Sequence, residues 1–366
     1  SCIKDEAPNA EADITGISFE EDVLANSYID LNPSYDESQN AYPIRISVKE
    51  GTDMTSLAPI FELTPGATIS PASGSVQNFT TPVRYTVTSE DKAWHRVYAI
   101  TAREQKASNI PTTYHFEKVR IMQNVWQEFY EEQDSGNELT WASGNKGFKW
   151  AMSEAATEDY PTTQIDNGKT GKCVKLETRL TGDLGNMVGM PIAAGNLFIG
   201  SFDMLNAITN PLSATRFGTP FYNKPLRLTG YYKYKAGEQF YENGEYTSRK
   251  DIFNIYAIFY DGVKYDSAGK GTDVTLDGNL PNQNYEHSSM VALALVSNPQ
   301  ETEGDEWKFF DIPFDYQRYG KKIDEARLAK GEYKIGIIFA SSKDGATFEG
   351  APGSTLLIDE VELIYE

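Results

Sequence analysis

The sequence predicts an all-β protein that consists of two β-sandwich domains. The first observation is a series of short alternating segments between residues 14 and 104, separated by turns that contain proline or glycine. The second is a longer region, residues 113–366, with strand candidates throughout and little helical periodicity. Many short strands joined by turns are typical of sandwiches and barrels rather than of parallel sheets with crossover helices.

Residues 14–104 form the first predicted domain. Ile44, Ile46 and Val48 share one face of a strand, because successive side chains of a strand point to opposite faces. The segment VRYTVTSEDKAWHRVYAITA, residues 83–102, contains two more strands and a polar turn. A domain of this size and pattern fits a small Greek-key sandwich with immunoglobulin-like architecture, and we expect Trp94 to lie in its core.

A polar segment without periodicity, residues 105–112, contains proline and is predicted to link the two domains. The second domain, residues 113–366, has only two segments with weak helical periodicity, KVRIMQNVWQEFY and KKIDEARLAK. Its number of strands indicates one large antiparallel sandwich, a jelly roll. The strand candidates are KCVKLETRL, NLFIGSFDM, PLRLTGYYKYK, DIFNIYAIFY, MVALALVS, EWKFFDIPF, YKIGIIFAS and STLLIDEVELIYE.

The composition argues against several classes of function. The chain has 366 residues, a formal net charge of −20 and a pI of about 4.6, so it lacks the basic surface that a nucleic-acid partner requires. No run of about 18 apolar residues is present, so the sequence contains no candidate transmembrane helix. Two cysteines and three scattered histidines do not have the spacing of zinc ligands, and no cofactor is predicted from them.

The first 13 residues, SCIKDEAPNAEAD, predict the tether of an exported lipoprotein. A small residue followed by cysteine is typical of the processing site of bacterial lipoproteins. The residues Lys4, Asp5 and Glu6 resemble the lysine-plus-two-acids signal that sends lipoproteins to the cell surface in Bacteroidetes. On this interpretation Cys2 carries the lipid anchor that attaches the protein to the outer membrane. The alternative is an arbitrary polar N-terminus with one unpaired cysteine.

Several long motifs of the second domain resemble a known family. They are FE at 116–117, TGKCVKLET, GNLFIGSF, FGTPF followed by KPLRLTGYYKYKAG, and SSKDGATFEGAPGSTLLIDEVELIYE. The family is the carbohydrate-metabolism domain of Bacteroidetes surface lipoproteins, which usually follows an immunoglobulin-like domain. The resemblance covers most of residues 113–366, and it implies a galactose-binding-domain-like jelly roll and an involvement with glycans.

The strand predicted for residues 225–235 has the side chains that a saccharide site needs. Sugars stack their C–H faces on aromatic rings and form hydrogen bonds with a few polar side chains. One face of this strand is apolar and is predicted to lie in the core: Leu226, Leu228, Gly230, Tyr232 and Tyr234. On the opposite face Arg227, Tyr231 and Lys233 are predicted to bind carbohydrate, and an ordinary solvent-exposed face is the alternative.

The segment DIFNIYAIFY, residues 251–260, extends this prediction. Phe253, Ile255, Ala257 and Phe259 form an apolar face, whereas Asn254 and Tyr256 point the other way. If the two strands are neighbours, Asn254, Tyr256 and the preceding Asp251 join the polar-aromatic patch around Tyr231. Trp126 and Trp141 are predicted to rim the same surface, with core packing as the alternative for each.

Two further predictions concern carboxylates. A glycosidase needs two of them, about 5–5.5 Å apart for retention or 6.5–9.5 Å for inversion, and Asp203 and Asp251 are the candidate pair. Glu117 and Asp359 occupy an early and a late position that can share a structural calcium ion in jelly-roll carbohydrate-binding modules. The alternative is a solvent-facing acid on each of the two terminal strands.

Three functions remain open from the sequence. The first is a cell-surface lipoprotein that binds oligo- or polysaccharides through a face or pocket of the jelly roll. The second is a glycoside hydrolase that uses a carboxylate pair in the same pocket. The third is a structural adhesin or spacer.

Overall fold

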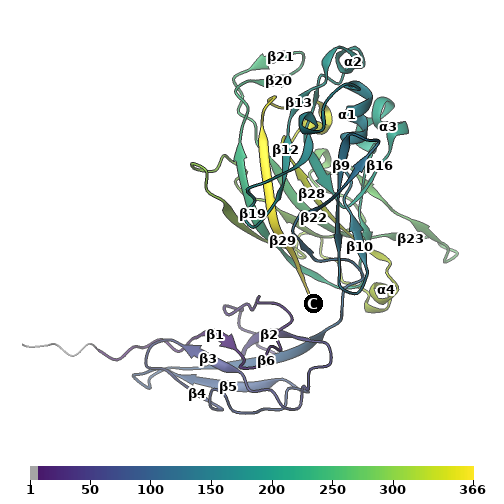
Figure 1. Cartoon of the computed structure of the whole chain (residues 1–366). Coiled ribbons are helices and arrows are strands. Elements are labelled where there is room, and N and C mark those ends of the chain that lie inside the picture. The colour runs from purple at the N-terminus through teal and green to yellow at the C-terminus, as the bar shows by residue number, and fades with distance from the viewer. Residues whose placement is uncertain (1–6) are drawn as a thin grey trace, which may run out of the picture. The chain divides into compact units, whose positions relative to one another are not determined.

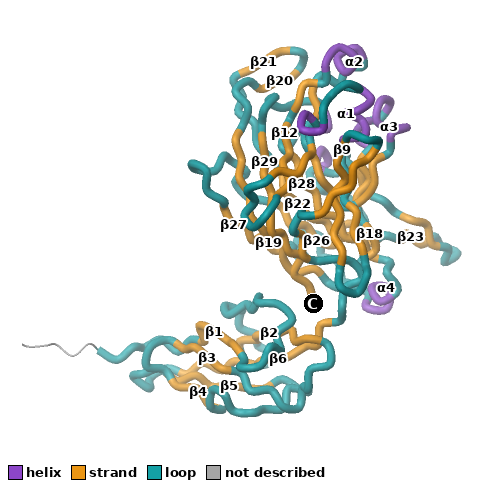
Figure 2. Tube along the Cα trace, viewed as in Figure 1, coloured by secondary structure: helices purple, strands orange, loops and turns teal. Residues whose placement is uncertain are grey.

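The computed structural model describes residues 7–366, which divide into two compact units (Figure 1). The first unit ends at Ala107, and the second comprises Ser108–Tyr365. Both consist mostly of strands and loops, as Figure 2 shows, which confirms the predicted all-β fold with a sandwich followed by a larger sandwich.

The predicted lipid anchor Cys2 and the signal Lys4–Glu6 lie outside the described residues. Within residues 7–366, no helix combines the length and the apolar composition that crossing a membrane requires.

The first unit contains a four-stranded sheet and a strand pair that share one core. The sheet has the order β2-β6-β5-β4, in which β2 is parallel to β6, and β1 pairs with β3. Ile44, Ile46 and Val48 are buried in the core, as predicted. The strands are β1 (Ile14–Ser18), β2 (Tyr42–Lys49), β3 (Ile60–Leu63), β4 (Thr68–Ser70), β5 (Val83–Thr88) and β6 (His95–Gln105).

Trp94 does not lie in the core of the first unit, so this prediction is wrong. The residue belongs to the turn between β5 and β6, where the Ser89 N–H donates a hydrogen bond to the Trp94 carbonyl. A turn at the end of a hairpin has no sheet face to bury its side chains against. The Trp94 side chain is accordingly 63% exposed.

The second unit is a sandwich of two antiparallel sheets. The first sheet, which we call the outer sheet, has the order β11-β12-β29-β19-β27, with β7 paired to β29. Its strands are β7 (Thr113–Tyr114), β11 (Thr162–Ile165), β12 (Cys173–Glu177), β19 (Pro225–Lys235), β27 (Lys308–Pro313) and β29 (Thr355–Tyr365). The second, which we call the covered sheet, has the order β15-β28-β22-β26, with β18 paired to β28. Its strands are β15 (Asn196–Phe198), β18 (Thr219–Pro220), β22 (Asn254–Asp261), β26 (Met290–Leu295) and β28 (Tyr333–Ala340).

The main core lies between these two sheets. The rings of Tyr232 and Tyr234, on β19, each have their centroid 4.9 Å from that of Phe253, which directly precedes β22. Leu228, Gly230 and both tyrosines are buried, which confirms the predicted inward face of β19 from Leu228 onward, whereas Leu226 is half-buried beside a register shift between Pro225 and Arg227. Aromatic side chains of this size bury the largest apolar areas of a core, and here they hold the two sheets together.

The covered sheet is buried on both faces, unlike the outer sheet. Tyr256, Ile258 and Tyr260 point away from the main core into a second apolar cluster with Phe217 and Leu276. Three short strands contribute to this layer: β16 (Gly200–Phe202), β17 (Thr215–Phe217) and β25 (Leu276–Asp277). A continuous apolar run such as NIYAIFY is typical of a strand buried on both sides.

Short helices and hairpins complete the second unit. Three helices gather at one end, α1 (Asn145–Ala151), α2 (Gly182–Met187) and α3 (Met204–Thr209), and α4 (Glu325–Ala329) lies at the other end (Figure 1). KKIDEARLAK thus contains a helical turn as predicted, whereas KVRIMQNVWQEFY forms the hairpin of β8 (Lys118–Met122) and β9 (Trp126–Glu132) instead. The remaining strands are β10 (Glu138–Thr140), β13 (Arg179–Leu180), β14 (Ile192–Ala193), β20 (Phe240–Glu242), β21 (Glu245–Thr247), β23 (Val263–Tyr265) and β24 (Gly271–Asp273). The single 3₁₀ turns are η1 (Thr157–Asp159), η2 (Pro211–Ser213), η3 (Pro281–Gln283) and η4 (Gly345–Thr347).

Candidate functional sites

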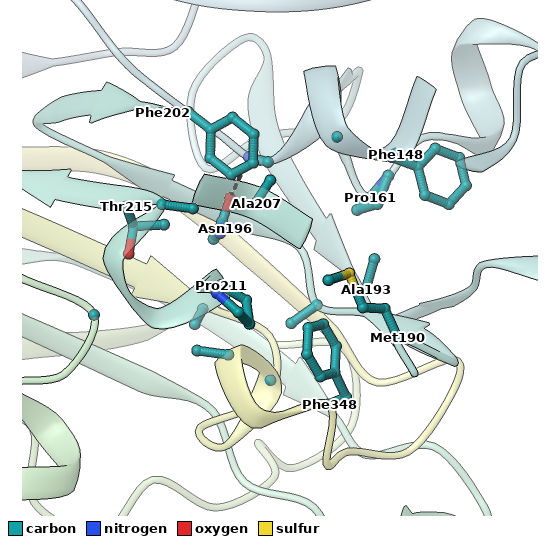
Figure 3. A pocket seen from close by; sticks show the side chains of 18 of the residues that line it. Phe148, Pro161, Met190, Ala193, Asn196, Phe202, Ala207, Pro211, Thr215 and Phe348 are labelled. Carbon is teal, nitrogen blue, oxygen red and sulfur yellow. Dashed lines mark hydrogen bonds between the residues drawn. The ribbon is translucent and has the colours of Figure 1, made fainter. Parts of the chain in front are cut away.

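A pocket lies where α1, α2 and α3 cover the end of the covered sheet (Figure 3). We call it the helix-walled pocket, and it encloses about 190 Å³. Its walls are largely apolar and include Phe148, Met190, Phe202, Ile208 and Phe348. Large apolar pockets of this kind are the usual places to look for a binding site.

The helices around the pocket are held by local polar contacts. The Asp203 side chain caps α3, because its Oδ1 accepts a hydrogen bond of 2.9 Å from the Leu205 N–H. The buried Asn145 side chain, at the start of α1, donates a bond of 2.8 Å to the Thr162 carbonyl. Gly147 allows α1 to approach the ring of Phe202, since an added Cβ would lie 3.2 Å from that ring.

The polar side chains in the pocket wall are mostly engaged with the protein itself. Asn196 Oδ1 accepts a hydrogen bond of 2.7 Å from the Gly144 N–H, and Asn254 Nδ2 donates one of 3.0 Å to the Tyr285 hydroxyl. Thr181 donates to the Met190 carbonyl, and Ser342 donates to Asp251. The wall therefore has few hydrogen-bonding groups left for a ligand.

The pocket also has a distinctive charge. Among the described residues that line it there is no aspartate or glutamate, and Lys343 is the one charged residue. Exposed apolar side chains lie on the surrounding helices: Trp150 on α1, Leu184 and Met187 on α2, and Leu205 and Ile208 on α3. Trp150 and Ile208 are themselves part of the pocket wall.

A second candidate site lies on the face of the outer sheet that points away from the core. We call it the sheet platform, and it comprises Arg227, Tyr231 and Lys233 of β19 with Trp307, Phe309 and Asp311 on or beside β27. Tyr231 is the direct cross-strand partner of Phe309, and their ring centroids are 5.2 Å apart. The Phe309 side chain is 53% exposed, so its ring is open to solvent.

Cations and carboxylates surround the rings of the sheet platform. Lys169 Nζ lies 5.0 Å from the centre of the Tyr231 ring, and Lys233 Nζ lies 4.9 Å from that of Trp307. Lys233 also pairs with Asp305 at 3.0 Å, and Arg227 pairs with Asp311 at 2.5 Å. Neither the Tyr231 hydroxyl nor the Trp307 indole N–H has a hydrogen-bond partner within the described residues.

The predicted carbohydrate-binding residues are divided between these two places. Arg227, Tyr231 and Lys233 lie together on the sheet platform, whereas Asn254 and Tyr256 line the helix-walled pocket. The expectation that all five form one patch is wrong, because β19 and β22 belong to different sheets. Tyr256 is buried against the second apolar cluster, and this burial raises its pKa well above the usual value.

Trp126 and Trp141 do not rim a surface. Trp141 is 1% exposed and packs edge-on against Tyr114, with ring centroids 5.1 Å apart. Trp126 is 8% exposed and belongs to a small cluster with Phe148 and Tyr160. Trp126 begins β9 and Trp141 follows β10. Both tryptophans are buried, as the alternative of core packing predicts.

The two predicted carboxylates of a hydrolase, Asp203 and Asp251, are each engaged in holding loops. Asp203 caps α3, as described above. Asp251 is buried, and its Oδ2 accepts bonds from Ser342 at 2.6 Å, Ser354 at 2.7 Å and the Ala351 N–H at 2.9 Å. Burial raises the pKa of Asp251, an effect that these donors partly offset. Asp203 and Asp251 share no hydrogen-bond partner within the described residues, and neither lines the helix-walled pocket.

Glu117 and Asp359 are brought to the same turn, residues 168–172. Glu117 accepts a bond of 2.7 Å from the Lys172 N–H, and Asp359 accepts one of 3.0 Å from the Thr170 N–H. Burial raises the pKa of Asp359 to about 6. Among the described residues there is no group of three His, Cys, Asp or Glu side chains arranged to hold a metal ion. The two carboxylates thus stabilise a turn by accepting hydrogen bonds from its backbone N–H groups. The calcium ion stays a prediction.

The sequence interpretation missed Trp307, Phe309 and Asp311 of the sheet platform and, apart from Asn254 and Tyr256, the lining of the helix-walled pocket. Trp307 and Phe309 lie in EWKFFDIPF, which the sequence predicts as a strand, but the sequence does not show that this strand pairs with β19. Their alternation with the buried Phe310 and Ile312 was the available signal. Nothing in the sequence indicates that Lys343 belongs to a site, because the sequence of a loop does not show which distant residues lie beside it.

Comparison with known proteins relates both units to carbohydrates. Residues 115–364 match the family described as "Putative carbohydrate metabolism domain", and residues 30–102 match "SGBP, N-terminal", the N-terminal region of surface glycan-binding proteins. The search of curated proteins found no match.

Two solved structures are similar to the chain. One is a putative glycoside hydrolase from Bacteroides thetaiotaomicron VPI-5482, with 45% identity over 99% of both chains and a TM-score of 0.63. The other is a putative glycoside hydrolase from Bacteroides vulgatus ATCC 8482 that is 50% identical in sequence. This match covers 71% of this chain and 100% of that chain, with a TM-score of 0.66. The match of residues 115–364 covers more than half of the sequence, so the chain belongs to the putative carbohydrate metabolism domain family.

Proposed function

We propose that the protein binds glycans at the cell surface and that the sheet platform is the binding site. The observation that carries the proposal is the ring pair of Tyr231 and Phe309, in which the Phe309 ring is half exposed. A solvent-exposed ring offers a flat apolar surface on which the C–H face of a pyranose can stack.

The polar groups beside these rings support the same proposal. The Tyr231 hydroxyl and the Trp307 indole N–H are unengaged within the described residues, so they are available to sugar hydroxyls. Arg227 and Asp311 hold each other in place and present a planar guanidinium next to a carboxylate. Groups fixed before binding lose less conformational entropy when the ligand arrives.

Affinity electrophoresis against a panel of polysaccharides tests this proposal. We expect at least one polysaccharide to retard the full chain, and Phe309→Ala and Tyr231→Ala to weaken that retardation by about tenfold or more, as the loss of a central aromatic contact does. Trp94→Ala is the matched control, because it removes an exposed ring from the first unit. The proposal fails if no glycan is retained by folded protein, or if Trp94→Ala weakens binding and the platform variants do not.

Glycoside hydrolysis is the second candidate function, favoured by the similarity of the chain to the two putative glycoside hydrolases. A reducing-sugar assay on any polysaccharide that binds addresses it, with Asp203→Asn and Asp251→Asn as the variants. Release of sugar that both substitutions abolish, while the protein remains folded, would support this function. Release that survives both substitutions would assign the chemistry to other carboxylates.

The location at the outer membrane is also part of the proposal. It is supported by the match of residues 30–102 to surface glycan-binding proteins and by the residues around Cys2. We expect a labelled fatty acid to be incorporated into the protein when it is expressed in a bacterium that processes such lipoproteins. The Cys2→Ala substitution should prevent this incorporation. Incorporation that persists in Cys2→Ala would contradict the lipid anchor at this residue.

A further inference from the structure

The helix-walled pocket has the size and lining of a site for a small apolar group. It encloses about 190 Å³ between aromatic and aliphatic side chains such as Phe148, Phe202 and Phe348. For scale, an apolar cavity of about 150 Å³ stays dry and binds benzene. A single ring with a short chain therefore fits the volume.

Saccharide chemistry does not suit this pocket. A sugar has a hydroxyl on nearly every carbon, and each hydroxyl loses a hydrogen bond to water when it is buried. The side chains of Asn196, Thr181 and Ser342 already bond to protein groups. Burying a sugar here would leave most of its hydroxyls without partners.

Lys343 gives the pocket one unpaired charge. Its side chain is exposed, and its ammonium group forms no ion pair within the described residues. The neighbouring Asp344 is paired with Arg249 at 2.8 Å, so this carboxylate does not compensate Lys343. Within the described residues, the pocket wall therefore contains one positive charge and no carboxylate.

We propose that the helix-walled pocket binds a small apolar carboxylate, with the ring or alkyl chain inside and the carboxylate at Lys343. Binding of this kind combines the burial of apolar area with a charge-assisted contact at the mouth. The exposed Trp150 and Ile208 extend the apolar wall towards solvent and add contact area for the part of the ligand outside. The ligand class differs from that of the sheet platform, so the two sites are independent.

Isothermal titration calorimetry with 3-phenylpropionate and its uncharged amide tests this proposal on the full chain. We expect the acid to bind more tightly than the amide by about tenfold, and raised salt to reduce the difference, because the contact with Lys343 is partly exposed. Lys343→Gln should remove the preference for the acid. Lys146→Gln, which removes an exposed lysine of α1 outside the pocket wall, is the matched control and should keep it.

A second variant tests the location of the apolar part. Ile208→Trp enlarges a partly exposed side chain at the mouth of the pocket, so the fold should tolerate it while the binding of both acid and amide is lost. The proposal is overturned if the acid does not bind, if Lys343→Gln keeps the preference, or if Ile208→Trp leaves both affinities unchanged. None of these outcomes bears on glycan binding at the sheet platform.

Discussion

The sheet platform and the helix-walled pocket are both rich in aromatic rings, but they leave different polar groups unpaired. On the sheet platform, the hydroxyl of Tyr231 and the indole N–H of Trp307 have no hydrogen-bond partner in the part of the chain that the structure describes, and the charged side chains are paired. In the pocket most of the neutral polar side chains bond to protein groups, and the single charged side chain, Lys343, forms no ion pair within residues 7–366. Aromatic content alone therefore does not identify a ligand class.

This difference follows from the two sheets themselves. The outer sheet buries one face, so the other face keeps alternating polar and aromatic side chains in contact with water. The covered sheet is buried on both faces, and polar groups near it must find partners in the protein. What remains available to a ligand is set by how completely each sheet is covered.

The largest effect is expected from Trp141→Ala, which truncates a buried ring in the main core between the two sheets. Because Trp141 is fully packed against Tyr114 and Phe116, its truncation should lower the free energy of unfolding by about 3–5 kcal/mol. Chemical denaturation of the full chain measures it. About 1 kcal/mol is the average loss for a point mutation of any kind. A loss below this value, together with a loss of glycan binding, would assign Trp141 to the binding surface instead of the core.

Asp251→Asn should affect stability next most strongly. The asparagine amide group cannot accept from the Ala351 N–H and from two serine hydroxyls in the same way, so we expect a loss of about 1–3 kcal/mol. Ser342 both lines the helix-walled pocket and donates a hydrogen bond to Asp251, so the substitution should also make the pocket wall less ordered. Glycan binding at the sheet platform should persist.

The pH dependence has a definite sign. Burial raises the pKa of Asp251, so the folded state keeps this proton to a higher pH than the unfolded chain does. The contribution of Asp251 to the free energy of unfolding therefore falls as the pH rises from the usual range of a carboxyl through its raised pKa. Melting curves of wild type and Asp251→Asn at several pH values measure this, and a difference that grows in favour of the wild type with rising pH would contradict it.

Exchanging ligands between the two regions tests the comparison directly. Phe309→Ala should weaken glycan binding by about tenfold and leave the binding of 3-phenylpropionate unchanged. Lys343→Gln should do the reverse, with a similar loss for the acid and none for the glycan. If either variant weakens both ligands equally in folded protein, the two regions are a single site or are coupled.

The smallest effect is expected at the turn that Glu117 and Asp359 support. If the predicted calcium ion binds there, added calcium should raise the melting temperature by a few degrees, which corresponds to about 1 kcal/mol. The same addition should have no effect on Asp359→Asn. A melting temperature that neither calcium nor a chelator changes would remove the calcium prediction.

Much of the fold could be predicted from local patterns, because alternation and turn residues act over a few residues. The buried face of β19, with Leu228, Tyr232 and Tyr234, followed from alternation alone. The same rule failed for Asn254 and Tyr256, because alternation states that two faces differ and not what covers each of them. Trp94 and Trp141 show the same limit, since one is exposed in a turn and the other is buried.

The sequence by itself determined the all-β class, the family, and the strand face that contains Arg227, Tyr231 and Lys233. Only the tertiary structure decided that Phe309 lies beside Tyr231, that Tyr256 belongs to a different sheet, and that Lys343 stands at an apolar pocket. The physical reason is that strand pairing and the covering of a sheet join residues far apart in the chain. No pattern within one short segment contains that information.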